Sequence, residues 1–175
     1  MDRYEVAQLN VGRAVAPLDD AVMADFMNWL DEINAIAERS PGFVWRLQGD
    51  NGNNTSLKVS DDPLFIVNLS VWSSIDALYE FTYRSDHKTV FKRRHEWFER
   101  MGIPTTVLWW RAAGTVPSVD EALARLDRLR SLGPTPDAFT FKQHFPPPRP
   151  DKDAAQPPAP AESSRARASE AGTRT

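Results

Sequence analysis

The 175-residue chain carries 21 basic and 24 acidic residues and is 41% hydrophobic, which is typical of one globular domain with a short extension. It contains no cysteine, so disulfides, thiolate metal sites, iron–sulfur clusters and cysteine nucleophiles are excluded. No apolar run approaches the roughly twenty residues that a membrane-spanning helix needs, which excludes a membrane protein. The N-terminal segment has no apolar signal core, so we expect a cytoplasmic protein.

Composition changes abruptly after residue 145. Residues 146–175 hold half of the 14 prolines and no aromatic residue, which predicts a disordered Pro/Ala-rich tail. Residues 1–145 are the predicted folded domain. The tail's five basic and four acidic residues leave that domain with 16 basic and 20 acidic residues. A domain with a net charge near −4 is a poor general binder of nucleic acid, so we expect no nucleic-acid partner.

The predicted domain begins with a strand over residues 4–11, where apolar and polar residues alternate. A helix follows, because Asp19 or Asp20 can cap it and apolar residues then recur on one helical face. These residues are Met23, Phe26, Met27, Leu30 and Ile33. The helix is expected to end before the Ser-Pro-Gly segment at 40–42, and a second strand is predicted over residues 43–48.

The third strand is predicted over residues 64–72. Ser73 and Asp76 have the spacing of a capping box and predict the start of a helix. After a break, a second helical piece is predicted to run to Met101. The fourth strand is predicted over residues 105–111.

This order indicates an α+β protein with a ferredoxin-like β-α-β-β-α-β arrangement. We expect a four-stranded antiparallel sheet with both helices on one face. Ser118 and Glu121 predict the start of an extra C-terminal helix, which ends at Gly133 and Pro134. We expect that helix to be an appendage to the core.

The two faces of the third predicted strand differ in composition. The odd-numbered face is uniformly apolar, and we expect it to pack on the two helices; it consists of Phe65, Val67, Leu69 and Val71. The even-numbered face mixes apolar and polar groups and consists of Leu64, Ile66, Asn68, Ser70 and Trp72. Leucine, isoleucine and tryptophan are poorly suited to face water, so we expect this face to be covered by a second copy of the sheet.

The expected homodimer would enclose a pocket between its two sheets. Asn68 and Ser70 would be polar groups in an otherwise apolar lining, which suits an apolar small-molecule ligand. Gln8 and Asn10 of the first strand add two further amide groups to the candidate site.

Five short segments carry a family resemblance. They are QLNVG at 8–12, PGFVWR at 41–46, VNLSVW at 67–72, YRSDH at 83–87 and EWF at 96–98. The segments resemble a bacterial family of domains of unknown function, DUF3291, over residues 4–145. The resemblance implies the dimeric α/β-barrel superfamily, which is related to antibiotic-biosynthesis-type monooxygenases. That superfamily includes cofactor-free, quinone-forming monooxygenases of polyketide pathways and haem-degrading oxygenases.

The resemblance implies particular site residues. The cofactor-free monooxygenases carry Asn-x-x-x-Trp on the strand before the second helix, which Asn68 and Trp72 match. They also use an asparagine on the first strand, which Asn10 matches. These amides would hold a phenol or phenolate beside the indole, and such donors act strongly on a developing oxyanion in a dry pocket.

The leading hypothesis is therefore a small-molecule enzyme that resembles cofactor-free monooxygenases. It would act on an apolar, aromatic substrate in the barrel pocket, with no cofactor and no bound metal. The predicted catalytic residues are Asn68, Trp72, His87 and Asn10, with His87 as the acid/base group. The predicted substrate-binding residues are Gln8, Ser70 and Ile66.

Two alternatives stay open. Haem-degrading relatives use a histidine ligand on the helix after the tryptophan, and His87 is the candidate for that ligand in a haem-binding or haem-degrading oxygenase. A non-catalytic ligand-binding or interaction module is the other alternative, with the proline-rich tail contacting other proteins. Residues 95–99 nearly match a zinc-protease helix, but Glu99 stands where the second histidine must be, which excludes that reading.

Overall fold

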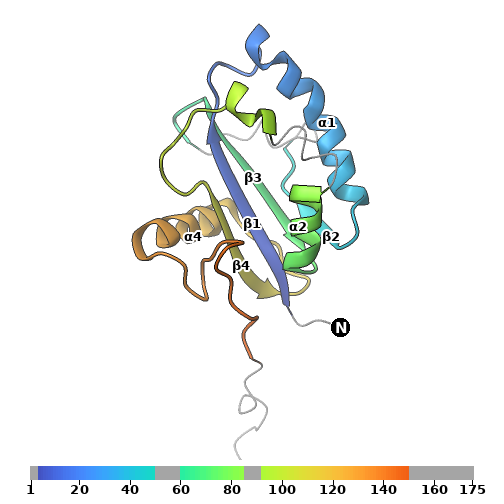
Figure 1. The fold of residues 1–175 in the computed structure, drawn as a ribbon, viewed down its shortest axis with the longest axis vertical. Helices are drawn as coiled ribbons and strands as arrows, with labels where there is room; N and C mark the ends of the chain where they lie inside the picture. Colours follow the sequence, from blue (N-terminus) through green and yellow to red (C-terminus); the bar gives the residue numbers. More distant parts are fainter. Residues whose placement is uncertain (1–3, 50–59, 85–91, 150–175) are drawn as a thin grey trace, which may run out of the picture.

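The computed structural model describes residues 4–49, 60–84 and 92–149. Its centre is a four-stranded antiparallel sheet with the strand order β2-β3-β1-β4 (Figure 1). The strands are β1 (Tyr4–Arg13), β2 (Phe43–Arg46), β3 (Phe65–Trp72) and β4 (Thr106–Ala112). This strand order confirms the predicted ferredoxin-like arrangement.

The first, second and last of the longer helices lie close to their predicted positions. The helices are α1 (Ala24–Arg39), which follows the short helix η1 (Ala21–Met23), α2 (Ile75–Arg84), η3 (Arg94–Glu96) and α4 (Val119–Leu132). Among the described residues, no helix combines the length and the apolar character needed to cross a membrane.

Side-chain caps fix two of the helix starts where they were expected. The Asp20 carboxylate accepts from the backbone N–H of Val22, and Ser118 accepts from the N–H of Glu121. The capping box predicted at Ser73 is displaced by one residue: Ser74 accepts from the N–H of Ala77. Ser73 instead donates its backbone N–H to the carbonyl of Gly42, 2.7 Å away, and so belongs to the turn that leaves the sheet.

The helix predicted to reach Met101 ends early. The chain leaves η3 at Glu96, and Phe98 forms an isolated bridge with Ala14. Both Trp97 and Phe98 pack on Phe26, and the backbone of Trp97 is still helical at the end of η3.

The apolar face of β3 is covered by α4 and not by the two ferredoxin-like helices. Val67, Leu69 and Val71 lie in one buried cluster with Leu126 and Leu129 of α4. The prediction that α4 is an appendage was therefore wrong, and so was the expectation that α1 and α2 pack on the odd-numbered face. In Figure 1, α4 lies to the left of the sheet and α1 and α2 lie to the right.

The even-numbered face is the one that α1 and α2 cover. Trp72 is packed with Leu78 of α2 and Ala37 of α1 at one end of this face. Ile66 contacts the cluster of Met23 and Trp97 at the other end. The expectation that a second chain must cover this face was wrong, because helices of the same chain do so. Helices therefore lie on both faces of the sheet, and on the even-numbered face they bury its two ends.

The chain after α4 returns to the edge of the sheet. Phe139 exchanges two backbone hydrogen bonds with Leu108 of β4, and its ring is fully buried. The Trp110 indole donates to the carbonyl of Phe145 over 2.6 Å. The chain is therefore attached to the sheet up to residue 145. The predicted tail at 146–175 lies outside the described residues from 150 onward and stays a prediction.

Candidate functional site

A band of polar side chains crosses the middle of the sheet face that α1 and α2 cover. We call it the polar band, and it consists of Gln8, Asn10, Asn68, Ser70 and Thr106. Strand register brings these residues together, because Gln8 lies opposite Ser70, and Asn10 lies between Asn68 and Thr106. Directly opposed residues of neighbouring strands point to the same side of a sheet.

Solvent reaches this band. Asn68 is exposed, Gln8, Asn10 and Thr106 are partly exposed, and only Ser70 is buried. On the opposite face of the same strand, Ala7, Leu9 and Val11 are buried. Along residues 7–11 of β1, the accessible side chains therefore lie on one face only.

Helix α1 runs between the two apolar ends of this face. Phe26, near its start, packs with the cluster at one end of the face, and Ala37, near its finish, packs with the cluster at the other end. The apolar residues between them, Met27, Leu30 and Ile33, are only partly buried. The accessible amides of the band and the partly exposed apolar residues of α1 therefore lie on the same side of the sheet, and together they suit an amphipathic small molecule.

Three residues of the face form a hydrogen-bond chain. The Trp72 indole Nε1–H donates to Ser70 Oγ over 3.0 Å, and Ser70 Oγ lies 3.1 Å from Gln8 Oε1. Trp72 is fully buried, with its ring stacked on Phe81 at 4.9 Å between centroids and edge-on to Phe43 at 5.4 Å. The indole is therefore held in place by packing as well as by its hydrogen bond.

The asparagines of the band differ in their bonding. Asn10 Nδ2 donates to Thr106 Oγ1 over 2.8 Å, which fixes the side chain across β1 and β4. Asn68 makes no side-chain hydrogen bond within the described parts of the chain and is exposed. Asn68 is thus the amide most available to a ligand, and Asn10 is the more rigid one.

Sequence reasoning missed one member of the band. Thr106 begins β4 and is partly exposed, and the register places it beside Asn10. The sequence places Thr106 in the fourth predicted strand. It does not show which face of the sheet Thr106 lies on, because that depends on the register of β4 with β1.

The remaining predicted site residues lie apart from these amides. Ile66 is partly buried at the apolar end of the face, next to Leu64. His87 lies outside the described residues. Its predicted role as a haem ligand or acid/base group therefore stays a prediction. No group of three metal-binding side chains occurs in residues 4–49, 60–84 and 92–149.

The polar band offers hydrogen bonds and no titratable group. Amides and hydroxyls can bind a carbonyl, phenol or phenolate oxygen. The proton movements of a reaction there would have to involve the substrate, water or a residue outside the band.

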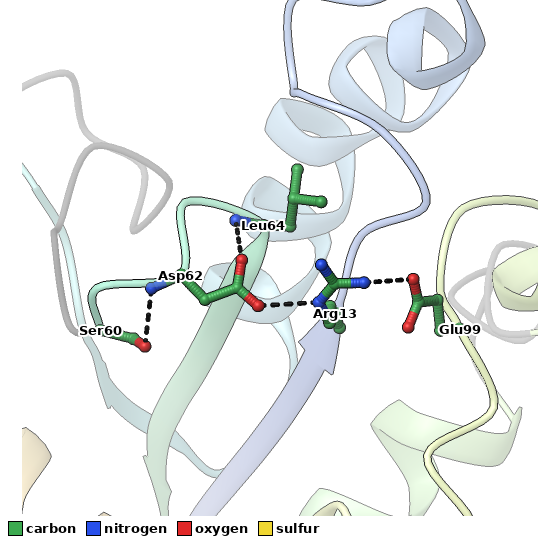
Figure 2. Close-up of polar contacts among 5 residues, drawn as sticks. All are labelled: Arg13, Ser60, Asp62, Leu64 and Glu99. Carbon is green, nitrogen blue, oxygen red and sulfur yellow. Dashed lines mark hydrogen bonds and ion pairs between the residues drawn. The ribbon is translucent and has the colours of Figure 1, made fainter.

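An ion cluster secures the end of β1 beside the apolar end of this face (Figure 2). Arg13 Nε lies 2.7 Å from Asp62 Oδ2, and Arg13 Nη1 pairs with Glu99. The other Asp62 oxygen accepts from the backbone N–H of Leu64 over 3.0 Å. The cluster thus joins three chain segments: the end of β1, the turn before β3 and the segment after η3.

The ion cluster predicts a pH-dependent contribution to stability. The hydrogen bond from Arg13, followed by the one from Leu64, holds the pKa of Asp62 below its ordinary value of 3.8. A lowered carboxyl pKa stabilises the fold above pH 3.8, and this contribution is lost as the pH falls through the folded-state pKa. Asp62→Asn should therefore unfold at lower urea than the wild type at pH 7, and the difference should shrink below pH 3.8. The exposed Asp19→Asn is the matched control, and equal midpoints of wild type and Asp62→Asn at pH 7 would contradict the argument.

The fold and the band together define a single ferredoxin-like α+β domain with accessible amides on the helix-covered sheet face. The chain belongs to the family of domains of unknown function DUF3291, which matches it over residues 5–155. No curated protein matches the chain.

Solved structures that are similar to the chain include the following two. SnoaB, a cofactor-independent oxygenase from Streptomyces nogalater, is 19% identical with a TM-score of 0.44, and the match covers 65% of this chain and 98% of SnoaB. A protein of unknown function from Nitrosomonas europaea is 13% identical with a TM-score of 0.42, and the match covers 66% of this chain and 97% of that protein.

Proposed function

We propose that the chain is a small-molecule oxygenase of the cofactor-free monooxygenase type, which binds an apolar, aromatic substrate against the polar band. The observation that carries this proposal is the set of solvent-accessible amides, Gln8, Asn10 and Asn68, on a sheet face that is otherwise covered by apolar helices. A domain that needed only a core would gain more from apolar side chains at these positions, since a polar group near the core adds stability only when it is bonded.

The proposed substrate is a phenol or phenolate with a fused aromatic body. Its ring would lie under Met27 and Leu30 of α1, and its oxygen would accept from the band. In the oxygenation, the phenol reacts as its anthrone-type keto tautomer, which has a ring CH2 group. One atom of O2 becomes the carbonyl oxygen on that carbon, and the other leaves as water with the two hydrogens of the CH2 group, which gives the quinone. Asn68 is the donor proposed to stabilise the anionic oxygen as charge develops on it.

The proposed roles of the other residues follow from their burial. Gln8 and Asn10 would bind the substrate, Ile66 would form an apolar wall, and Ser70 would hold Gln8. Trp72 is fully buried and its N–H is bonded, so we assign it to the support of the site and not to contact with substrate.

Turnover of a phenol panel tests this proposal. Anthrone-type polycyclic phenols would be incubated with the protein and O2, without added metal or cofactor. The expected result is uptake of one O2 per quinone formed, at a rate proportional to protein. Saturable binding without any O2 uptake would favour the non-catalytic ligand-binding module.

The homodimer is part of the same proposal. Helix α4 covers the part of the odd-numbered face that β1 and β4 form. At the β2 and β3 side of the same face, the side chains of Trp45, Leu47 and Phe65 stay partly exposed. A second copy packed there would bury them, since pairing through the even-numbered faces is blocked by α1 and α2. Native mass spectrometry should show a dimer that Trp45→Glu weakens, and a monomeric wild type at micromolar concentration would contradict the proposal.

A further inference from the structure

We propose that Gln8 is the substrate-orienting donor of the polar band. The buried indole of Trp72, acting through Ser70, sets which end of the Gln8 side-chain amide faces the ligand. The proposal rests on the proposed function only in requiring an aromatic ligand with an oxygen, and not in requiring turnover. It assigns Ser70 and Trp72 as positioning residues.

The direction of the hydrogen-bond chain is fixed by chemistry. An indole N–H can only donate, so Ser70 Oγ is an acceptor toward Trp72 over 3.0 Å. The one hydroxyl proton of Ser70 is then available for Gln8 Oε1, 3.1 Å away. The opposite orientation of the Gln8 amide would bring a second donor to Ser70 and leave the hydroxyl proton of this buried residue without an acceptor among the described residues, which is costly.

Packing makes this chain rigid. Trp72 is fully buried between the rings of Phe43 and Phe81, and Ser70 is 7% exposed. The indole cannot rotate without losing its ring contacts, and the Ser70 hydroxyl cannot rotate without losing a hydrogen bond. The orientation set by the indole is therefore transmitted through Ser70 to Gln8, at the accessible end of the hydrogen-bond chain.

The accessible end is the Gln8 amide nitrogen. With Oε1 turned to Ser70, both Nε2 protons face away from it, and Gln8 Nε2 bonds to nothing within the described ranges. Gln8 thus presents only donors to a ligand, whereas a free glutamine could turn either end outward. The matching ligand group is an acceptor oxygen, a carbonyl or a phenolate, placed over the centre of the sheet.

Asn10 is the second point of the same recognition. It lies two residues along β1 on the same face, about 7 Å from Gln8 by strand geometry. One Nδ2 proton is bonded to Thr106, and Oδ1 has no hydrogen-bond partner among the described residues, so Oδ1 can accept from a ligand. A ligand with an acceptor oxygen near Gln8 and a hydroxyl near Asn10 would satisfy both residues.

A pair of probes of equal shape tests the proposal. 2-Acetylnaphthalene carries the acceptor oxygen, and 2-isopropenylnaphthalene has a CH2 group in its place. The affinities of both would be measured for the intact wild-type chain and for Gln8→Met, Ser70→Ala and Trp72→Phe. Because any loss of stability lowers both affinities alike, the ratio of the two is the informative quantity.

We expect the wild type to bind the ketone roughly fivefold to tenfold more tightly than the hydrocarbon, the range of a single neutral hydrogen bond. The ratio should fall close to one in Gln8→Met and to less than half of its wild-type value in Ser70→Ala and Trp72→Phe. Ser70→Thr keeps the hydroxyl and should restore the ratio.

Matched controls are available on the opposite side of the sheet. Trp109→Phe removes an indole N–H that is equally buried and has no partner among the described residues, and Ser131→Ala removes an exposed hydroxyl on α4. Both should keep the wild-type ratio. A ratio unchanged in Ser70→Ala and Trp72→Phe, or no binding of either naphthalene to the wild type, would overturn the proposal. A ketone preference that depends on these residues without O2 uptake on phenols would uphold it and count against the proposed oxygenase.

Discussion

Asn68→Ala should lower the turnover of the phenol substrate by about 10²- to 10³-fold, the usual cost of removing one donor to a developing oxyanion. The same change should barely affect stability. Asn68 is exposed and makes no side-chain hydrogen bond within the described residues, and surface substitutions of that kind stay within about 0.5 kcal/mol. Steady-state kinetics and thermal unfolding of the same preparation would measure both effects.

Two companion variants sharpen the Asn68 experiment. Asn68→Asp replaces the donor by an anion and should be at least as damaging, because like charges repel at the substrate oxygen. Asn28→Ala removes an exposed amide from α1 and should keep wild-type turnover. Turnover by Asn68→Ala within twofold of wild type would show that this amide is not the proposed donor.

Gly42→Ala should produce the largest loss of stability among the single changes considered. Gly42 has φ +84°, and an added Cβ would lie 2.5 Å from the Cβ of Ala77 and 2.6 Å from Ser73 Oγ. Left-handed backbone costs about 1–2 kcal/mol for a residue with a Cβ, and overpacking adds about 1–3 kcal/mol. We expect a loss of about 2–5 kcal/mol and a fall in Tm of about 4–20 °C.

Gly114→Ala separates the two parts of that cost. Gly114 has φ +76°, but an added Cβ would meet no atom within 4 Å. This variant should therefore show the backbone penalty alone, about 1–2 kcal/mol. Denaturant unfolding of both variants gives the comparison, and equal losses would mean that the turn at Gly42 yields to the added methyl group.

Local patterns predicted the elements well because each is specified by nearby residues. The Ser118 cap and the glycine after α4 set the bounds of that helix, and the alternation along β1 and β3 set those strands. The early end of η3 could not be predicted in this way. It depends on two distant residues that the Phe98 ring packs against, Phe26 and Gly12. A Cβ on Gly12 would lie only 2.8 Å from the Phe98 ring, so the ring can occupy this place only because residue 12 is a glycine.

The faces of the sheet were assigned wrongly for a physical reason. The uniform apolar character of Val67, Leu69 and Val71 predicts a buried face, but it does not say which helix covers that face. Helix α4 covers it, and the mixed face carries the polar band. The pairing of Gln8 with Ser70, and of Asn10 with Asn68, depends on a register that local patterns do not determine.

Binding of an oxygen-bearing aromatic ligand by the polar band can be observed at the band's own side chains. We would titrate the ¹⁵N-labelled chain with 1-naphthol and follow it by NMR. We expect saturable shifts of the side-chain amide signals of Gln8, Asn10 and Asn68, with the backbone amide of Leu126 on α4 unmoved. Shifts confined to α4 and the opposite sheet face, or no saturable shift of the three side-chain amides, would contradict binding at the polar band.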